Sequence, residues 1–129
     1  MIKLQANNQK AAIYCRVASA DDNAIEQQRR TMHDFAAEQM YYNCAEYLDN
    51  GESGLTFNRP AFSQLCNDIH TGKIDVVFIK CISRISRDMI AAHEWLHKMR
   101  ALGVRVVSQN EGAVMPYELY SIFAKAQNL

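Results

Sequence analysis

Ile74-Asp75-Val76-Val77-Phe78-Ile79 is the most strand-like stretch of the chain. Its residues are mostly β-branched or aromatic and almost uninterrupted by polar side chains, which is typical of a strand that is covered on both faces. Helical patterns lie before and after it. We therefore expect residues 74–79 to form a central strand of an α/β sheet.

The segments around this strand predict an alternation of strands and helices. Apolar runs indicate further strands over residues 11–17, 44–48 and 104–108. Apolar residues at helical spacing indicate three helices, which begin near Asn23, Pro60 and Met89; Asn23 and Glu26 resemble a capping box, and Gly72 and Gly103 close the second and third helices. Because such an alternation implies right-handed crossovers, we expect a mostly parallel sheet of about four to five strands with helices on both faces.

The composition is that of one compact domain. The chain has 129 residues, of which 49% are hydrophobic and 22% charged, so disorder is excluded as its main state. Fourteen basic side chains balance 14 acidic ones, which leaves no overall field to attract a polyanion, and any contact with nucleic acid must be local. No linker or repeat is visible, so we expect a single domain over residues 1–129.

The sequence also predicts the cellular setting. No apolar run approaches the roughly 20 residues that span a bilayer, and no secretory segment is visible at the start, so we expect a cytoplasmic protein without membrane contact. The cysteines form no C-x-x-C pair and each lies in an apolar stretch, which indicates reduced, buried thiols; they are Cys15, Cys44, Cys66 and Cys81.

The densest chemical signal is Ser83-Arg84-Ile85-Ser86-Arg87-Asp88, between the central strand and the next helix. Ligands of open α/β sheets bind at this end of the strands. Two arginines three residues apart at a helix N-terminus, where unpaired N–H groups also favour an anion, indicate a phosphate site. The alternative is a solvated basic loop in which Asp88 only caps the helix.

Two more arginines point to the same place. Arg16 is a cation inside the first apolar run, and a parallel arrangement of the first and third strands brings it near Arg84 and Arg87. Arg59 follows a glycine-rich loop and makes a fourth cation. Because a cluster of like charges is costly without a counter-ion, the arrangement favours an anion such as a phosphoryl group. The alternative for Arg16 is a side chain that merely extends to the surface.

These segments resemble the catalytic domain of serine recombinases, the resolvase/invertase family, and above all its large branch from transposons and phages. The resemblance extends from about Ala11 to Gly112 and rests on Tyr14 to Ser19, Gln27, Asp49 to Pro60, and Ser83 to Asp88. It implies cleavage and rejoining of DNA through a phosphoserine intermediate without cofactor or metal. It also implies that Arg16, Arg59, Arg84 and Arg87 hold the scissile phosphate, while Gln27 and Asp88 orient the site.

The resemblance has further implications for assembly. A DNA-binding region is expected outside this chain, and the protein is expected to form a homodimer, and a tetramer in the active complex with DNA. The final stretch, Pro116 to Leu129, has an apolar helical face that would serve this self-association and then stops without a cap; the face consists of Leu119, Ile122, Phe123 and Ala126. We therefore expect a C-terminal helix that the end of the chain interrupts.

One position departs from the family pattern. The nucleophilic serine of the family directly follows Arg-Val, and here that position is Ala18, whose methyl group cannot attack phosphorus. Ser19 is adjacent, but consecutive side chains of an extended strand face opposite ways, so Ser19 would need a local shift to replace it. We expect the fold and the phosphate pocket without the reaction. The alternative is a non-catalytic, DNA-associated interaction domain.

A competing motif is His93-Glu94-Trp95-Leu96-His97, which matches the H-E-x-x-H pattern of zinc metallopeptidases. A zinc site needs a third protein ligand, and only Glu111 and Glu118 follow as candidates. The alternative, a plain amphipathic helix whose histidines flank its apolar stripe, needs no further ligand.

Overall fold

The computed structural model describes residues 9–55 and 58–114, which form an α/β sheet. The strand order is β2-β1-β3-β4-β5, with the first four strands in sequence parallel and β5 antiparallel to β4. The strands are β1 (Ala11–Val17), β2 (Cys44–Asn50), β3 (Val76–Ile79), β4 (Arg105–Ser108) and β5 (Gly112–Ala113). The helices are α1 (Asp22–Glu38), α2 (Pro60–His70), α3 (Met89–Ala101) and a short 3-10 turn, η1 (Ile82–Arg84).

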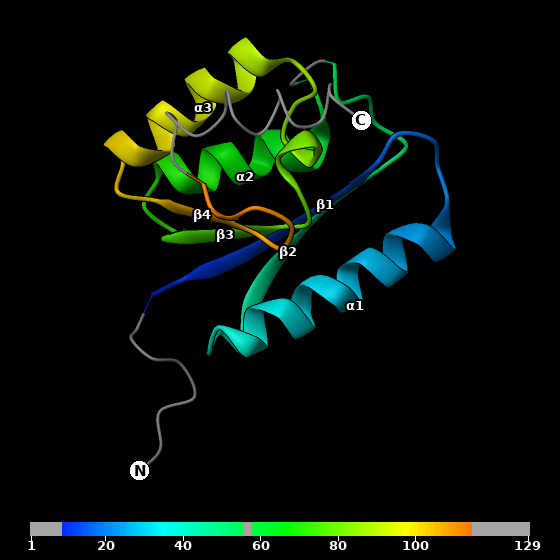
Figure 1. Cartoon of the computed structure of the whole chain (residues 1–129), viewed down its shortest axis with the longest axis horizontal. Coiled ribbons are helices and arrows are strands. Elements are labelled where there is room, and N and C mark those ends of the chain that lie inside the picture. Colours follow the sequence, from blue (N-terminus) through cyan, green and yellow to red (C-terminus); the bar gives the residue numbers. More distant parts are fainter. Residues whose placement is uncertain (1–8, 56–57, 115–129) are drawn as a thin grey trace.

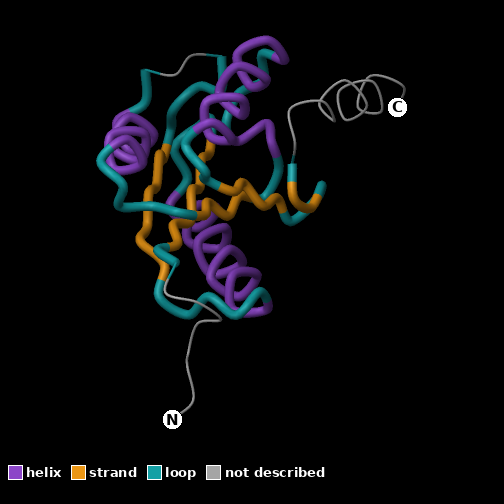
Figure 2. Tube along the Cα trace, turned by 90° about the vertical axis from the view of Figure 1, so that its left-hand side faces the viewer, coloured by secondary structure: helices purple, strands orange, loops and turns teal. Residues whose placement is uncertain are grey.

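Helices cover both faces of the sheet. Helix α1 lies on one face, and α2 and α3 lie together on the other (Figure 1). The view in Figure 2 shows the strands (orange) between these two helical layers. The predicted mostly parallel sheet with helices on both faces is therefore confirmed.

Strand β3 is the central strand, as predicted from residues 74–79. All of its residues are buried; Phe78 packs in the apolar cluster on the α1 side, and Val77 and Ile79 pack in the cluster on the α2 and α3 side. The strand is shorter at its start than predicted. Asp75 instead turns back to Lys10, whose main-chain N–H donates to the Asp75 carboxylate at 2.8 Å.

Strand β1 sets the direction of the side chains that matter for the site. Ile13 and Cys15 pack toward α1, whereas Ala12 and Tyr14 pack toward α2 and α3. Since side chains of a strand alternate between the faces, Arg16 follows Tyr14 on the α2 and α3 side, at the carboxyl end of the strand. The alternation therefore places the Arg16 side chain on the face of the sheet that α2, the helix after Arg59, covers.

The first helix begins earlier than predicted. Asp21, in an extended conformation, is its N-cap, and its Oδ1 accepts a hydrogen bond from the main-chain N–H of Ala24 at 3.0 Å. Asn23 lies inside the first turn, and Glu26 pairs with Arg29 and Arg30. The capping box of Asn23 and Glu26 is therefore wrong, because Asp21 already satisfies the free N–H group at this end of the helix.

The helix ends agree with the predictions from glycine. Gly72 and Gly103 follow α2 and α3 with φ angles of 78° and 75°, in the left-handed region that favours glycine.

Strand β5 was not predicted, because two residues carry no periodicity. Glu118 and the apolar face of the expected C-terminal helix lie outside the described residues. None of the helices in the described part is both long and apolar enough to cross a membrane.

The corrected helix start makes a prediction about stability. We expect Asp21→Ala to lower the free energy of unfolding by about 1 kcal/mol, because a helix N–H loses its acceptor. Asn23→Ala, the matched control, is expected to change it by less than about 0.5 kcal/mol, since Asn23 occupies an ordinary helical position. Urea denaturation of both variants measures the difference. A larger loss for Asn23→Ala would restore the capping box that the structure rejects.

Candidate functional site

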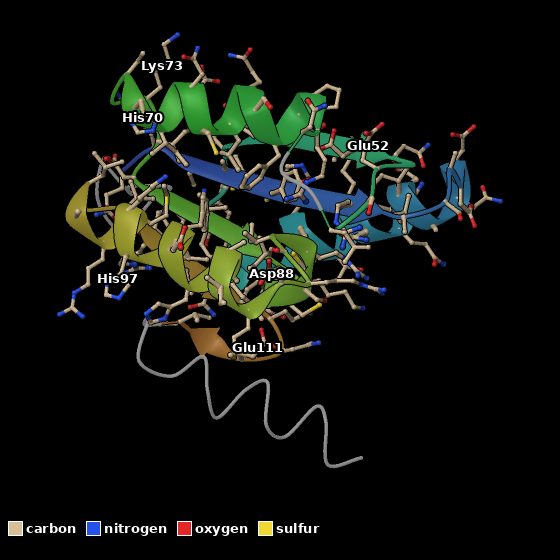
Figure 3. All side chains as sticks on the ribbon, turned by 90° about the horizontal axis from the view of Figure 1, so that it is seen from above. Glu52, His70, Lys73, Asp88, His97 and Glu111 are labelled. Atoms are coloured by element: carbon tan, nitrogen blue, oxygen red, sulfur yellow. The ribbon has the colours of Figure 1, made fainter. Side chains whose placement is uncertain are left out.

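The candidate site lies at the carboxyl ends of β1 and β3. The end of β1, the loop that precedes α2, the turn η1 and the start of α3 meet there. In Figure 3, the labelled Glu52 and Asp88 lie at this end of the molecule, and His70, Lys73 and His97 lie at the other. The parallel pairing of β1 with β3 accounts for the meeting, because it brings residues that follow both strands to one edge.

Arg16 is buried at this edge, with 1% of its surface exposed. Its guanidinium donates to three main-chain carbonyl oxygens: Nε to Arg84 at 3.1 Å, Nη1 to Glu52 at 3.0 Å and Nη2 to Ser83 at 2.8 Å. Burial, and next the charge of Arg59, lowers the pKa of Arg16 from its ordinary value. The side chain therefore ties β1 to η1 and to the loop before α2.

Arg59 is fully buried beside it. Its Nη1 donates to the carbonyl oxygen of Arg84 at 2.8 Å and to the hydroxyl of Tyr14 at 3.0 Å, and its Nη2 donates to the carbonyl oxygen of Ile85. The guanidinium carbon also lies 4.5 Å from the centroid of the Phe62 ring, within cation–π range. Arg16 and Arg59 thus converge on one carbonyl, that of Arg84.

The other two arginines lie nearer to solvent. Arg84 is half-buried, and its buried Nε has no hydrogen-bond partner among the described residues. Arg87 is exposed, and its main-chain N–H donates to the carbonyl oxygen of Gly54 at 3.0 Å. The arginines do come together, but they do not all face one open pocket. Main-chain oxygens already bind the guanidinium groups of Arg16 and Arg59, whereas the sequence predicted that all four arginines hold the phosphate.

Gly54 allows this close packing. A Cβ atom at this position would lie 2.6 Å from Nη2 and 2.9 Å from Cζ of Arg16, closer than real contacts permit. Any larger residue would therefore displace the Arg16 guanidinium or the loop. The sequence indicated this glycine only as part of a glycine-rich loop. The structure shows that the buried Arg16 side chain needs a residue without a Cβ atom here.

A buried carboxylate, for which no role was predicted from the sequence alone, balances the site. Asp49, at the end of β2, accepts hydrogen bonds from the Tyr14 hydroxyl at 2.7 Å and from the main-chain N–H groups of Ala61 and Phe62 at 2.9 and 3.0 Å. It therefore caps α2 from the neighbouring strand, where the N-cap residue Arg59 makes no side-chain cap. Burial, followed by the hydrogen bond to Asp49, raises the pKa of Tyr14.

The structure also places the residues expected around the nucleophile position. Ala18 and Ser19 are both exposed in a bend directly after β1. Gln27 is exposed, whereas Gln28 is buried and binds the main chain of Arg16: its Oε1 accepts from the N–H at 3.0 Å, and its Nε2 donates to the carbonyl at 3.3 Å. Gln28 lies on the buried face of α1 with Ile25 and Met32, a helical spacing by which the sequence could have indicated it.

Asp88 is the N-cap of α3. Its Oδ1 accepts hydrogen bonds from the main-chain N–H groups of Ile90 and Ala91 at 3.0 and 3.5 Å. This is the helix-capping role that the sequence left open as the alternative. The cap fixes the start of α3 directly after Arg87, and so it also fixes the position of that arginine.

The histidine motif lies outside this site. His93 and His97 are neighbours on α3, with 3.0 Å between their Nε2 atoms. Glu111, one of the expected third ligands, instead accepts a hydrogen bond from the main-chain N–H of Ile82 at 3.0 Å. Within residues 9–55 and 58–114, no group of three or more histidine, cysteine or acidic side chains is arranged to hold a metal.

Comparison with known structures finds several similar catalytic domains. The N-terminal catalytic domain of TP901-1 integrase is 24% identical, with a TM-score of 0.77 over 93% of this chain and 95% of that one. A resolvase family site-specific recombinase from Streptococcus pneumoniae is 25% identical, with a TM-score of 0.74 over 94% and 89%. The C-terminal catalytic domain of ISC1926 TnpA, an IS607-like serine recombinase, is 25% identical, with a TM-score of 0.71 over 78% and 67%.

Comparison of the sequence with known families identifies the family to which the chain belongs. No curated protein sequence matches the chain. The sequence profile described as "Resolvase, N terminal domain" matches residues 11–126, which include every strand and helix that surrounds the arginines. The chain therefore belongs to the resolvase family of serine site-specific recombinases.

Proposed function

We propose that this chain is the catalytic domain of a DNA recombinase that binds a DNA phosphodiester at Arg84 and Arg87 but carries no nucleophile at position 18. The observation that carries the proposal is the pairing of an exposed and a half-buried arginine with two buried ones at the carboxyl edge of a parallel sheet. Open α/β sheets bind their ligands at this edge, and guanidinium groups match phosphate oxygens in geometry and charge.

The four arginines have different tasks in this proposal. Arg84 and Arg87 meet the phosphate first, because their side chains lie nearest to solvent. Arg16 and Arg59 lie behind them and hold the phosphate mainly through their charge, which a poorly solvated interior screens less than water does. In the family reaction, these charges would stabilise the additional negative charge on five-coordinate phosphorus.

The residue at position 18 decides the chemistry. Covalent catalysis needs a hydroxyl oxygen to attack phosphorus, and the Ala18 side chain offers only a methyl group. In this proposal the chain binds and orients DNA without forming a phosphoserine link. Asp88 orients the site through the start of α3. Gln27 orients the site by its family resemblance, and Gln28 holds the main chain of Arg16 through two hydrogen bonds.

The proposal extends to the assembly. We propose that residues 1–129 form one catalytic domain of a cytoplasmic protein whose DNA-recognition region lies elsewhere. Self-association to a dimer, and to a tetramer on DNA, would bring two such sites to each duplex. With a net charge of zero, the isolated domain neutralises few phosphates, so its binding to DNA is expected to be weak and sensitive to salt. A non-catalytic DNA-associated domain is the second candidate, favoured by Ala18.

The phosphate site is tested by removing Arg84 and Arg87, the two more accessible arginines. We expect Arg84→Ala and Arg87→Ala each to weaken binding of a short DNA duplex at low salt about ten-fold or more, because each removes a charge-assisted contact to phosphate. Arg30→Ala, which removes an exposed arginine from α1, is the matched control and is expected to leave the affinity within about two-fold. NMR titration measures the affinities. An equal loss in all three variants would show that only overall charge matters.

The nucleophile position is tested by restoring the serine. In the full-length protein with its DNA site, we expect Ala18→Ser to produce a covalent protein–DNA link through phosphoserine, because the arginines already stabilise the charge on phosphorus. Denaturing gel electrophoresis of a nicked substrate detects the link. Adding Ser19→Ala to this variant is expected to leave the link largely intact.

Two outcomes would contradict this assignment. Links formed by the Ala18 protein and abolished by Ser19→Ala would make Ser19 the nucleophile. An inert Ala18→Ser protein that still binds its DNA site would favour the non-catalytic domain.

A further inference from the structure

Two exposed apolar residues lie close to Arg87, one along the chain and one next to a residue that hydrogen-bonds its main chain. Leu55 and Ile90 have 76% and 66% of their surface exposed, the highest values among the large hydrophobic residues in the described part of the chain. Leu55 directly follows Gly54, whose carbonyl oxygen accepts the Arg87 N–H at 3.0 Å. Ile90 lies in the first turn of α3, three residues after Arg87. The loop and the helix thus each bring an exposed apolar residue close to the main chain of Arg87.

The main-chain N–H of each residue has a side-chain acceptor two residues earlier. The Leu55 N–H donates to the Ser53 hydroxyl at 3.1 Å, and the Ile90 N–H donates to the Asp88 carboxylate at 3.0 Å. A single exposed leucine needs no explanation. A leucine and an isoleucine near one arginine that is proposed to bind phosphate combine a positive charge with apolar surface.

We propose that Leu55 and Ile90 contact the deoxyribose carbons next to the phosphate that binds Arg87. This inference rests on the proposed function and names the part of the substrate that the site recognises. A phosphodiester in DNA carries a sugar on each side, and the C–H faces of these sugars are apolar. Burial of these C–H faces against leucine and isoleucine would remove apolar surface of both partners from water. The site would thus prefer a sugar–phosphate chain to a free phosphate.

Charge argues against a second copy of this chain as the occupant. In a two-fold symmetric contact, the same patch meets itself, so Arg84 and Arg87 of one copy would approach those of the other. Like charges at such a contact are unfavourable. DNA supplies the opposite charge and the apolar surface together. Because apolar contacts do not depend on counter-ion release, the contribution of Leu55 and Ile90 should also persist as the salt concentration rises.

The experiment compares two probes on the full chain with labelled leucine and isoleucine methyl groups. A short DNA duplex is expected to shift the methyl signals of Leu55 and Ile90, whereas inorganic phosphate is expected to leave them unchanged. Leu55→Ser and Ile90→Ser are each expected to weaken DNA binding about three- to ten-fold, the effect of losing some 30–50 Å² of apolar contact, with phosphate binding unchanged. Leu102, 45% exposed and at the far end of α3, gives the matched control Leu102→Ser.

The outcomes separate this inference from the proposed function. If Arg84→Ala and Arg87→Ala weaken DNA binding while Leu55→Ser and Ile90→Ser behave like Leu102→Ser, the sugar contact is overturned and the phosphate site stands. If DNA binding does not depend on the arginines, both are overturned. If the Leu55 and Ile90 signals shift with protein concentration alone, a second copy covers the patch and the sugar contact is overturned.

Discussion

The guanidinium group of Arg16 brings a positive charge into the interior of the domain, and the surrounding structure has to compensate it. Burying a cation costs several kcal/mol unless its donors find acceptors. Three carbonyl oxygens, from Ser83, Arg84 and Glu52, supply them, and Arg59 adds a second buried cation to the same turn. The turn η1 and the loop before α2 are therefore held in the positions that these donors require. Those positions in turn leave Arg84 half-buried and Arg87 exposed at this edge.

The compensation also explains the buried carboxylate of Asp49. The Asp49 carboxylate accepts a hydrogen bond from the Tyr14 hydroxyl, and this hydroxyl accepts one from Arg59. The Tyr14 side chain therefore joins the acid to the cation. The same carboxylate holds the N–H groups at the start of α2. Loss of one charged member of such a buried set typically costs about 3–5 kcal/mol, because its partner stays behind uncompensated. Stability and the shape of the phosphate site therefore depend on the same contacts.

The sequence predicted those features that follow from periodicity and chain direction. The central strand, the glycine ends of α2 and α3, and the approach of Arg16 to Arg84 all follow from local patterns combined with parallel strands. It did not predict that carbonyl oxygens cover Arg16 and Arg59. Every residue has a main-chain carbonyl, so no residue type in the sequence shows which carbonyls will accept these hydrogen bonds. The capping box at Asn23 failed because a better acceptor, Asp21, lies two residues earlier.

Hydrogen exchange of the arginine side chains tests the burial of Arg16 most directly. In the ligand-free chain, the Nε–H of Arg16 is expected to exchange at least about a hundred-fold more slowly than that of Arg87, because exchange requires opening of several charge-assisted hydrogen bonds. NMR spectra that resolve arginine Nε–H signals measure both rates. Exchange of Arg16 as fast as that of Arg87 would show that its guanidinium is open to solvent and that the main chain of η1 is held by something else.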